Sequence, residues 1–376
     1  MRRRLPLIQK LKHWYGRECD WFKGGLGRSR FLNADKHSPA SSARSDCVHE
    51  QVAKRIANVR FTEETAWRME GAARRLQFQI EATDQGETVW NYLTRKKGFT
   101  KMQVKRMKFQ PGGICIDQKQ VRVTHVLAAG ERLEVSLEAP KRKKGKLQAE
   151  SEMNSGMMPD ILYEDRDVLA VWKPHGMILH PTHGHHGDTL MERMQVRLAQ
   201  RDGLEAADVP LYSIGRLDSD TSGIVVFARN QVAAQRLWQQ RMDGRFQKQY
   251  LAKCEGHFPK KTDEEQCISQ PVAPVPGELN RMRVDPAGKH AVTYCRIWRE
   301  MENETWLLLH LETGRTHQIR VHMAWMGYPL VGDSLYGNGK AGETCAALTA
   351  CSAVFFQPFT GKRILLNYLD KAERGE

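Results

Sequence analysis

Three kinds of feature are missing from this chain of 376 residues. No apolar run reaches the ~20 residues that a helix needs to cross a bilayer, which argues against a membrane protein. No secretory apolar segment follows Met1, so we expect a cytoplasmic protein in a reducing compartment. The eight cysteines form no CxxC pair, so neither a zinc ribbon nor a thioredoxin-type motif is supported.

Positive charge is abundant. Lys and Arg number 58 against 44 Asp and Glu, which gives a formal net charge of +14. This excess favours an anionic partner, and nucleic acid comes first among those. With 27% charged and 40% hydrophobic residues, most of the chain is expected to be globular, and its length suffices for two or three domains.

Residues 1–68 differ from the rest of the chain. They open with MRRR and contain the polar run HSPASSARSD at 37–46, so we predict a basic, disordered extension. Three interpretations stay open: an arm that touches RNA, a small element of unknown type, or sequence upstream of a true start at Met69. Mass spectrometry of the protein from its native cell would test the last of these, and an N-terminus at Met1 would rule it out.

Residues 77–138 predict a small α+β module with a basic helix. A helix follows Gly98 with Thr100 as its N-cap, and strands are expected at 114–117, 121–126 and 131–137. Five cations of this helix and of the turn before it are candidates for binding RNA phosphates: Lys96, Lys97, Lys101, Lys105 and Arg106. An ordinary solvated helix face remains the alternative. A basic linker, 139–159, follows.

Two dense polar clusters adjoin predicted buried strands farther along. The first is a turn that holds Arg216, Asp218 and Asp220, just before the apolar strand Ile224 to Ala228. A carboxylate beside such a strand needs a partner, although the turn could simply bond its own backbone. The second cluster, residues 312–323, follows the strand Thr305 to Leu311, and we predict that it begins a helix. Its candidate RNA-binding residues are Arg315, His317 and Gln318, with Arg320 one turn further on.

Two other patterns have mainly structural interpretations. The helix predicted from Asn230 to about Met242 carries Ala234, Leu237, Trp238, Arg241 and Met242 along one side, a stripe more typical of core than of a binding surface. Four histidines, at 180, 183, 185 and 186, fall close together. Their spacing fits no zinc pattern well, so we predict no metal site.

Taken together, these segments resemble the RluA-type pseudouridine synthases, which isomerise uridine to pseudouridine in RNA. The similarity spans residues 160–370 and rests on LYEDRDVLAVWKPHGMILHP, GRLDSDTSGIVVFARN, KQYLAKCEG, GKHAVTY, LETGRTHQIRVHMAWMGYPLVGDSLYG and QPFTGKR. The segment 77–138 resembles the small RNA-binding domain of the ribosomal-protein-S-four type, or alpha-L motif, through its helix pair, ICIDQKQV and GERLEV. In the latter, Asp117 and Gln118 replace a usual Asn-Gly turn.

The resemblance implies an α+β fold: a mixed, largely antiparallel catalytic sheet flanked by helices, with a central RNA cleft, behind a small α+β RNA-binding domain. By position, Asp218 matches the family's catalytic aspartate, Tyr250 the tyrosine that lies over the target base, and Arg320 the arginine paired with the aspartate. Arg216 matches an arginine that helps to hold the base out of its stack. The chain departs from the family at Gly215, where histidine is usual, and at Thr349 and Gln357.

This chemistry needs no redox cofactor, because no electron or group enters or leaves. Asp218 must be ionised to attack the nucleoside or to remove a sugar proton, and the sequence does not choose between these. We predict that Arg320 pairs with Asp218 and positions it. The expected partner is RNA, ribosomal first and transfer RNA second, bound by a monomer. Two alternatives stay open: a catalytically silent RNA-binding protein of ribosome assembly, and a hydrolase that uses Asp218 with His317.

Overall fold

A computed structural model describes residues 75–137, 158–182, 187–259, 265–278, 280–337 and 345–375. The predicted extension 1–68, nearly all of the predicted linker 139–159, and His183, His185 and His186 lie outside these ranges. No helix within them has the length and apolar character to cross a membrane.

The first described part is a small α+β module. Its four-stranded sheet has the order β1-β4-β2-β3, with all neighbours antiparallel. Helical segments pack on this sheet around a core that includes Tyr92, Leu93 and Val104. The elements are β1 (Arg75–Gln79), η4 (Ala82–Asp84), α3 (Val89–Asn91), the π-helical turn η5 (Tyr92–Lys96), α4 (Lys101–Lys108), β2 (Ile114–Ile116), β3 (Lys119–Gln120) and β4 (Arg132–Ser136).

The basic helix of the module begins as predicted. The Thr100 side chain accepts a hydrogen bond from the Gln103 amide, and the Gln103 side chain accepts one from the Thr100 amide, which completes a capping box. The strand expected at 121–126 is wrong, because β3 ends at Gln120 and Val126 forms only an isolated bridge with Thr88. Asp117 and Gln118 form the tight turn between β2 and β3, both with positive φ (45° and 70°).

The larger part is built on a ten-stranded mixed sheet. Eight strands follow the order β10-β13-β14-β9-β15-β8-β6-β5, while β16 pairs with β15 and β7 with β8. Only β15 and β8 are parallel, so the prediction of a mixed, largely antiparallel sheet is confirmed. In chain order the strands are β5 (Ile161–Glu164), β6 (Val168–Lys173), β7 (Tyr212–Ser213), β8 (Ser222–Ala228), β9 (Gln247–Glu255), β10 (Gln266–Ser269), β13 (Val292–Glu300), β14 (Glu304–Leu311), β15 (Leu348–Phe356) and β16 (Arg363–Asn367).

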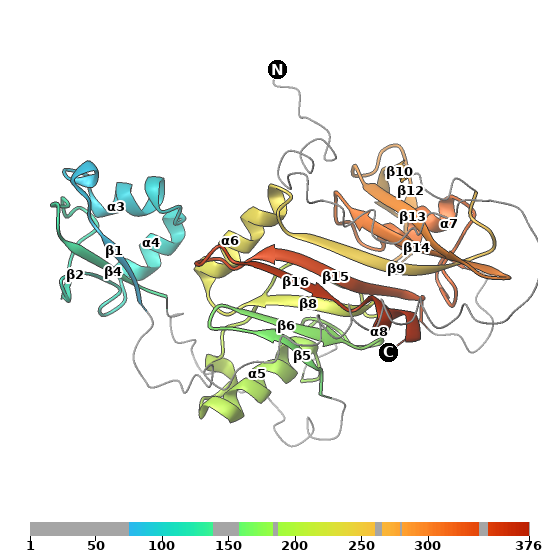
Figure 1. The fold of residues 1–376 in the computed structure, drawn as a ribbon, viewed down its shortest axis with the longest axis horizontal. Helices are drawn as coiled ribbons and strands as arrows, with labels where there is room; N and C mark the ends of the chain where they lie inside the picture. Colours follow the sequence, from blue (N-terminus) through green and yellow to red (C-terminus); the bar gives the residue numbers. More distant parts are fainter. Residues whose placement is uncertain are drawn as a thin grey trace, which may run out of the picture. The chain divides into compact units, whose positions relative to one another are not determined.

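The long central strands carry apolar side chains on both faces. On one face, Val225 and Phe227 of β8 and Tyr250 of β9 share a core cluster with α5 and α7. On the other, Ile224 and Val226 pack with residues of α6 and β16. Figure 1 shows β9, β15, β8 and β6 running side by side, with α5 near β5 and β6. The helical elements are α5 (Leu190–Asp202), η7 (Ala206–Asp208), α6 (Gln231–Met242), α7 (Gln318–Trp325) and α8 (Leu369–Arg374).

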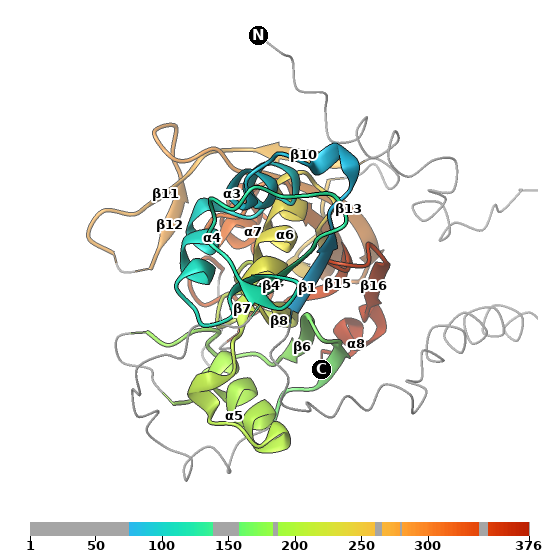
Figure 2. The same cartoon turned by 90° about the vertical axis from the view of Figure 1, so that its left-hand side faces the viewer.

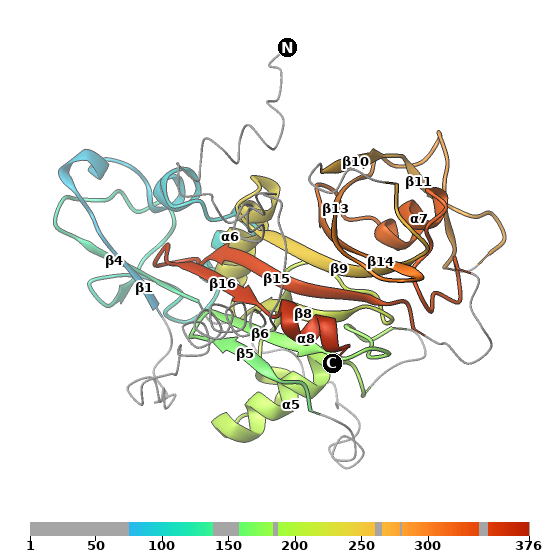
Figure 3. The ribbon, with the colours of Figure 1, turned by 45° about the vertical axis from the view of Figure 1, so that its right-hand side comes forward.

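The segment 255–288 contains three short strands among its described residues. One is β10, and the others are β11 (Val272–Pro274) and β12 (Met282–Val284), which pair with each other. In Figure 2 this two-stranded ribbon projects from the main sheet. Figure 3 shows β10, β13 and β14 curving around α7. The Gln318 amide of α7 donates to Val292 and Thr293 of β13, so this curved part of the sheet fixes where the helix begins.

The helix predicted from Asn230 is present as α6, but only part of its predicted inward stripe is buried. The Asn230 side chain accepts from the Ala233 amide. Leu237 is fully buried, whereas Trp238 is 43% exposed and Met242 is 78% exposed. The last turn of α6 therefore extends beyond the core that its first turns cover.

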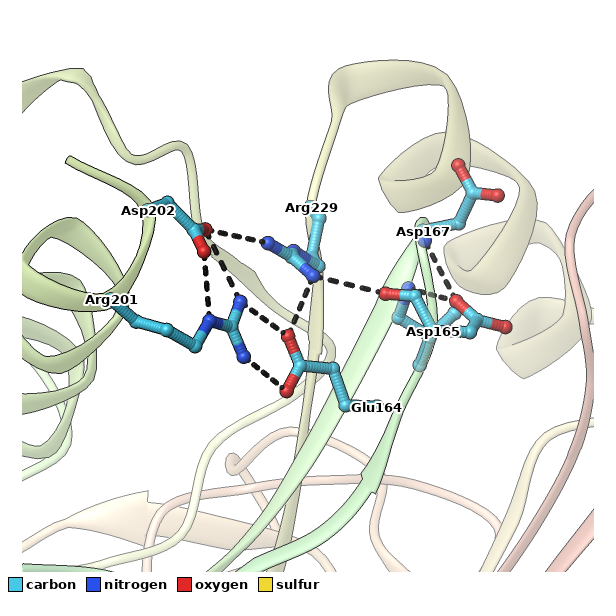
Figure 4. A network of polar contacts seen from close by, with 7 residues as sticks. Glu164, Asp165, Asp167, Arg201, Asp202 and Arg229 are labelled. Carbon is cyan, nitrogen blue, oxygen red and sulfur yellow. Dashed lines mark hydrogen bonds and ion pairs between the residues drawn. The ribbon is translucent and has the colours of Figure 1, made fainter. Parts of the chain in front are cut away.

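A charged network fixes α5 to the sheet (Figure 4). Glu164, the last residue of β5, accepts hydrogen bonds from both terminal nitrogens of Arg201 and from Arg229. Asp202 accepts a further hydrogen bond from Arg201 and pairs with Arg229 at 3.7 Å. The ends of β5, β8 and α5 are thus held together by charge-assisted hydrogen bonds.

Candidate active site

The turn that carries Asp218 leads directly into β8, which is buried along its whole length. Gly223 comes so close to β15 that a Cβ atom there would lie 2.3 Å from the Ala350 carbonyl oxygen, and its φ is +109°. Only glycine suits both conditions. The parallel pairing of β8 with β15 therefore depends on the glycine that ends the turn.

Buried Lys173, at the end of β6, holds the middle of the turn. Its Nζ donates to the Ser219 carbonyl at 2.8 Å and to two carbonyls of its own loop. Burial lowers the pKa of Lys173 to about 8, against the opposing effect of Asp218 and Asp220. His175 binds the turn as well, since its Nδ1 lies 2.8 Å from the Asp220 carbonyl oxygen. The backbone between the two aspartates is thus fixed from the β6 side.

The sheet register places Tyr250 near this turn. Ala350 of β15 pairs with Gly223 on one side and with Tyr250 on the other. Neighbouring strands lie about 4.8 Å apart, so Tyr250 stands roughly 10 Å from Gly223 across the sheet. Gly223 has no side chain and Ala350 has only a methyl group, so neither fills the space between Gly223 and Tyr250. Burial, together with Asp218, raises the pKa of Tyr250 to about 12, so its phenol is protonated at neutral pH.

The Asp218 carboxylate is available to a substrate. It is partly exposed, and it makes no hydrogen bond or ion pair with any other residue that the structure describes. It nevertheless acts electrostatically on Lys173, Tyr250 and His317. An anchored turn therefore presents a carboxylate without a described partner near a buried lysine, a histidine and a buried tyrosine.

The predicted direct pairing of Arg320 with Asp218 is wrong. Arg320, 2% exposed, donates through Nη1 to Asp220 at 3.0 Å and grips Asp333 with Nε and Nη2, at 2.8 and 2.7 Å. Its effect on Asp218 is electrostatic only. Each of the three guanidinium nitrogens donates to one of the two other carboxylates, so Arg320 holds the turn through Asp220.

Asp333 is the buried carboxylate that anchors Arg320. Burial alone would raise its pKa, but the hydrogen bonds from Arg320 and from the Leu335 and Tyr336 amides outweigh burial and hold the pKa below its ordinary value. Asp333 is therefore ionised at neutral pH and fixes the guanidinium that in turn fixes Asp220.

The second polar cluster is divided between a turn and the helix. His317, with a positive φ of 54°, is the N-cap of α7 rather than part of it. Its Nδ1 lies 2.9 Å from the Tyr336 hydroxyl, and no hydrogen bond joins it to Asp218 among the described residues. Burial lowers the pKa of His317, so the imidazole is neutral at pH 7. The Asp218–His317 pair that a hydrolase would need is not formed.

The other residues predicted to bind RNA are placed differently from one another. Arg216 is exposed in the Asp218 turn, and Arg315 is exposed with its Nε on the His290 carbonyl. Gln318 is 2% exposed, and its amide bonds only with protein groups, so we leave it out of the proposed RNA-binding set. No cluster of three metal-ligating side chains occurs within the described ranges, where His180 bonds with Ser213.

Sequence reasoning missed three residues that build the site. Lys173 was a lone cation at the end of an otherwise apolar strand, which is the signal of a buried, bonded lysine. In the sequence, Asp220 is only one member of a polar turn, and Asp333 only one residue of a segment that carries the family resemblance. Their role depends on which carboxylate meets Arg320, and spacing along the chain does not encode that.

A family model described as RNA pseudouridylate synthase matches residues 167–325. The uncharacterized RNA pseudouridine synthase YlyB of Bacillus subtilis is 32% identical over 254 residues, which covers 67% of this chain and 80% of that protein. The ribosomal large subunit pseudouridine synthase D of Escherichia coli K12 is 38% identical over 180 residues, 48% of this chain and 52% of that one.

Among solved structures, the chain is similar to human RNA pseudouridylate synthase domain containing 1. The sequence identity is 23% and the TM-score 0.45, and the match covers 60% of this chain and 85% of that chain.

Proposed function

Because the chain belongs to the RNA pseudouridine synthase family, we propose that it converts uridine to pseudouridine in structured RNA, with Asp218 as the reacting carboxylate. The observation that carries the proposal is the Asp218 carboxylate, which bonds no other described residue and lies in a turn anchored by Lys173 and by Arg320 through Asp220. A group that must contact the substrate needs a fixed backbone and no competing partner.

The geometry suits an isomerisation without net gain or loss of atoms. The bond from the ribose to the uracil nitrogen breaks, the base turns, and a bond from the ribose to a uracil carbon forms. That carbon loses its proton, and the released nitrogen gains one. Asp218 either attacks the nucleoside or removes a sugar proton, and both need the ionised form. The Tyr250 ring offers a surface for the detached uracil and a protonated hydroxyl. The target must first leave its stack, at a cost of a few kcal/mol.

We propose ribosomal RNA as the substrate. The relative from Escherichia coli is named for the large ribosomal subunit, and the net charge of +14 suits a large structured RNA. Transfer RNA is the competing substrate. The positive charge suits ribosomal and transfer RNA alike, so the two substrates have to be distinguished by experiment.

The test is to incubate the purified protein with total RNA from a strain that lacks it, and to map pseudouridine in all RNA classes. We expect new pseudouridine in ribosomal RNA. Modification confined to transfer RNA would mean that transfer RNA, and not ribosomal RNA, is the substrate. No modification in any RNA would favour a catalytically silent RNA-binding protein.

We further propose that the module at 75–137 binds RNA phosphates through α4, in the manner of the ribosomal-protein-S-four domain it resembles. Lys101, Lys105 and Arg106 are exposed and have no hydrogen bond or ion pair to other described residues. Lys96 is less available, because it bonds Asp84 at 2.5 Å and pairs with Glu87. Lys97 lies over the Phe78 and Tyr92 rings.

Replacing Lys101, Lys105 and Arg106 together by glutamine should weaken RNA binding and flatten its salt dependence. Each lost phosphate contact lowers the slope of log affinity against log salt by about 0.7 to 0.9, so three should remove roughly 2 to 3. Binding is measured by fluorescence anisotropy over a salt series. An unchanged slope would indicate that α4 presents an ordinary solvated face and does not bind RNA phosphates.

A further inference from the structure

The last turn of α6 brings an arginine to the active site. A Cβ atom at Gly215 would lie 2.0 Å from Nη1 of Arg241, and one at Gly314 would lie 2.7 Å from Nη2. The two ends of one guanidinium therefore occupy the space that these two glycines leave free. Gly215 stands three residues before Asp218, and Gly314 three residues before His317.

The backbone at Gly215 is adapted to this arrangement. Its φ of +92° favours glycine, and any side chain there would have to displace the guanidinium. The Trp238 ring, one helical turn earlier, lies 5.4 Å from the Arg241 guanidinium carbon and holds it by a cation–π contact.

Arg241 acts electrostatically on the site, and no described residue pairs with its charge. It works against the rise in the pKa of Tyr250 that burial causes. It also lowers the pKa of Lys248, which burial chiefly reduces to about 7, so the neighbouring lysine is half neutral at that pH. Across the described residues, the Arg241 guanidinium makes no hydrogen bond and no ion pair.

We propose that Arg241 binds a phosphate of the RNA strand beside the target uridine. The guanidinium is partly buried and its donors bond no described residue, so it can accept an anion, and its planar fork matches two phosphate oxygens. The inference rests on the proposed function, because it assumes that the strand entering the site is RNA. It adds a contact from α6, which lies outside the two polar clusters of the sequence.

The test uses the full chain and a short fluorescent oligouridylate. Arg241→Gln should lower its affinity about tenfold and reduce the slope of log affinity against log salt by about 0.7, one single-strand phosphate contact. Arg241→Lys keeps the charge and should keep the slope. The matched control is Arg245→Gln, since Arg245 already pairs with Asp243 at 2.8 Å.

In turnover with cellular RNA, Arg241→Gln should raise KM with kcat nearly unchanged, as expected for a contact made equally in the ground and transition states. An unaltered slope for Arg241→Gln, or an equal loss for Arg245→Gln, would overturn the proposal. If the wild-type protein modified no RNA, the proposed function would fail while the salt slopes still reported on Arg241.

Discussion

Asp218→Asn should reduce pseudouridine formation by about 10⁴-fold or more while leaving the fold and RNA binding intact. The amide is nearly isosteric but cannot attack the nucleoside or accept its proton, and loss of a reacting group has effects of this size. The carboxylate bonds to no other described residue, so the free energy of unfolding should change by less than about 1 kcal/mol. Activity is measured by chromatography of nucleoside digests, and stability by urea unfolding.

The matched control for this variant is Asp160→Asn. Asp160 is an exposed aspartate that pairs with Lys371. Both residues are far in the sequence from the turn that carries Asp218. It should retain full activity. Asp218→Glu keeps the charge but moves the carboxylate by one methylene, and a shift of about 1 Å can cost a hundredfold. Wild-type rates for Asp218→Asn would remove Asp218 from the mechanism.

The elements around the site were predictable where they depend on local pattern. The strand at 224–228 is a continuous apolar run, and the caps Thr100 and Asn230 each precede a helix whose first turn needs an acceptor. Each signal lies within a few residues, so the chain itself contains the information.

The contacts of the arginines were not predictable in the same way. Asp218 and Asp220 differ by two positions, and only the folded turn shows that Asp220 is the one that Arg320 bonds. Arg241 was grouped with the inward stripe of its helix. Its real position depends on gaps left by Gly215 and Gly314, 99 residues apart. The contact with Arg241 thus explains why glycine stands at position 215, where the family usually has histidine.

Arg320→Met should both destabilise the protein and abolish most activity. It would leave the Asp333 carboxylate, which is 0% exposed, without its cation, and breaking a buried pair in this way costs about 3–5 kcal/mol. It would also release Asp220 and the turn that carries Asp218. Urea unfolding measures the first effect and the nucleoside assay the second. Wild-type stability in this variant would contradict the buried pair.

The double variant Arg320→Met with Asp333→Asn separates these two effects. The amide oxygen can still accept from the Leu335 and Tyr336 amides, so most of the lost stability should return. Activity should stay low, because Asp220 remains untethered. A double variant that regained both would show that Arg320 acts through stability alone.

The pH dependence of the Arg320→Met defect has a definite sign. In the wild type the pKa of Asp333 is lowered, so its contribution is fully present above the unfolded-state pKa of about 3.9 and is lost as the pH falls through the folded-state pKa. Without Arg320, burial would raise that pKa, and protonation would relieve the uncompensated charge. The difference in unfolding free energy between variant and wild type should therefore be largest near neutral pH and shrink toward acid pH. A difference that grew on acidification would mean that Asp333 is not the carboxylate that Arg320 stabilises.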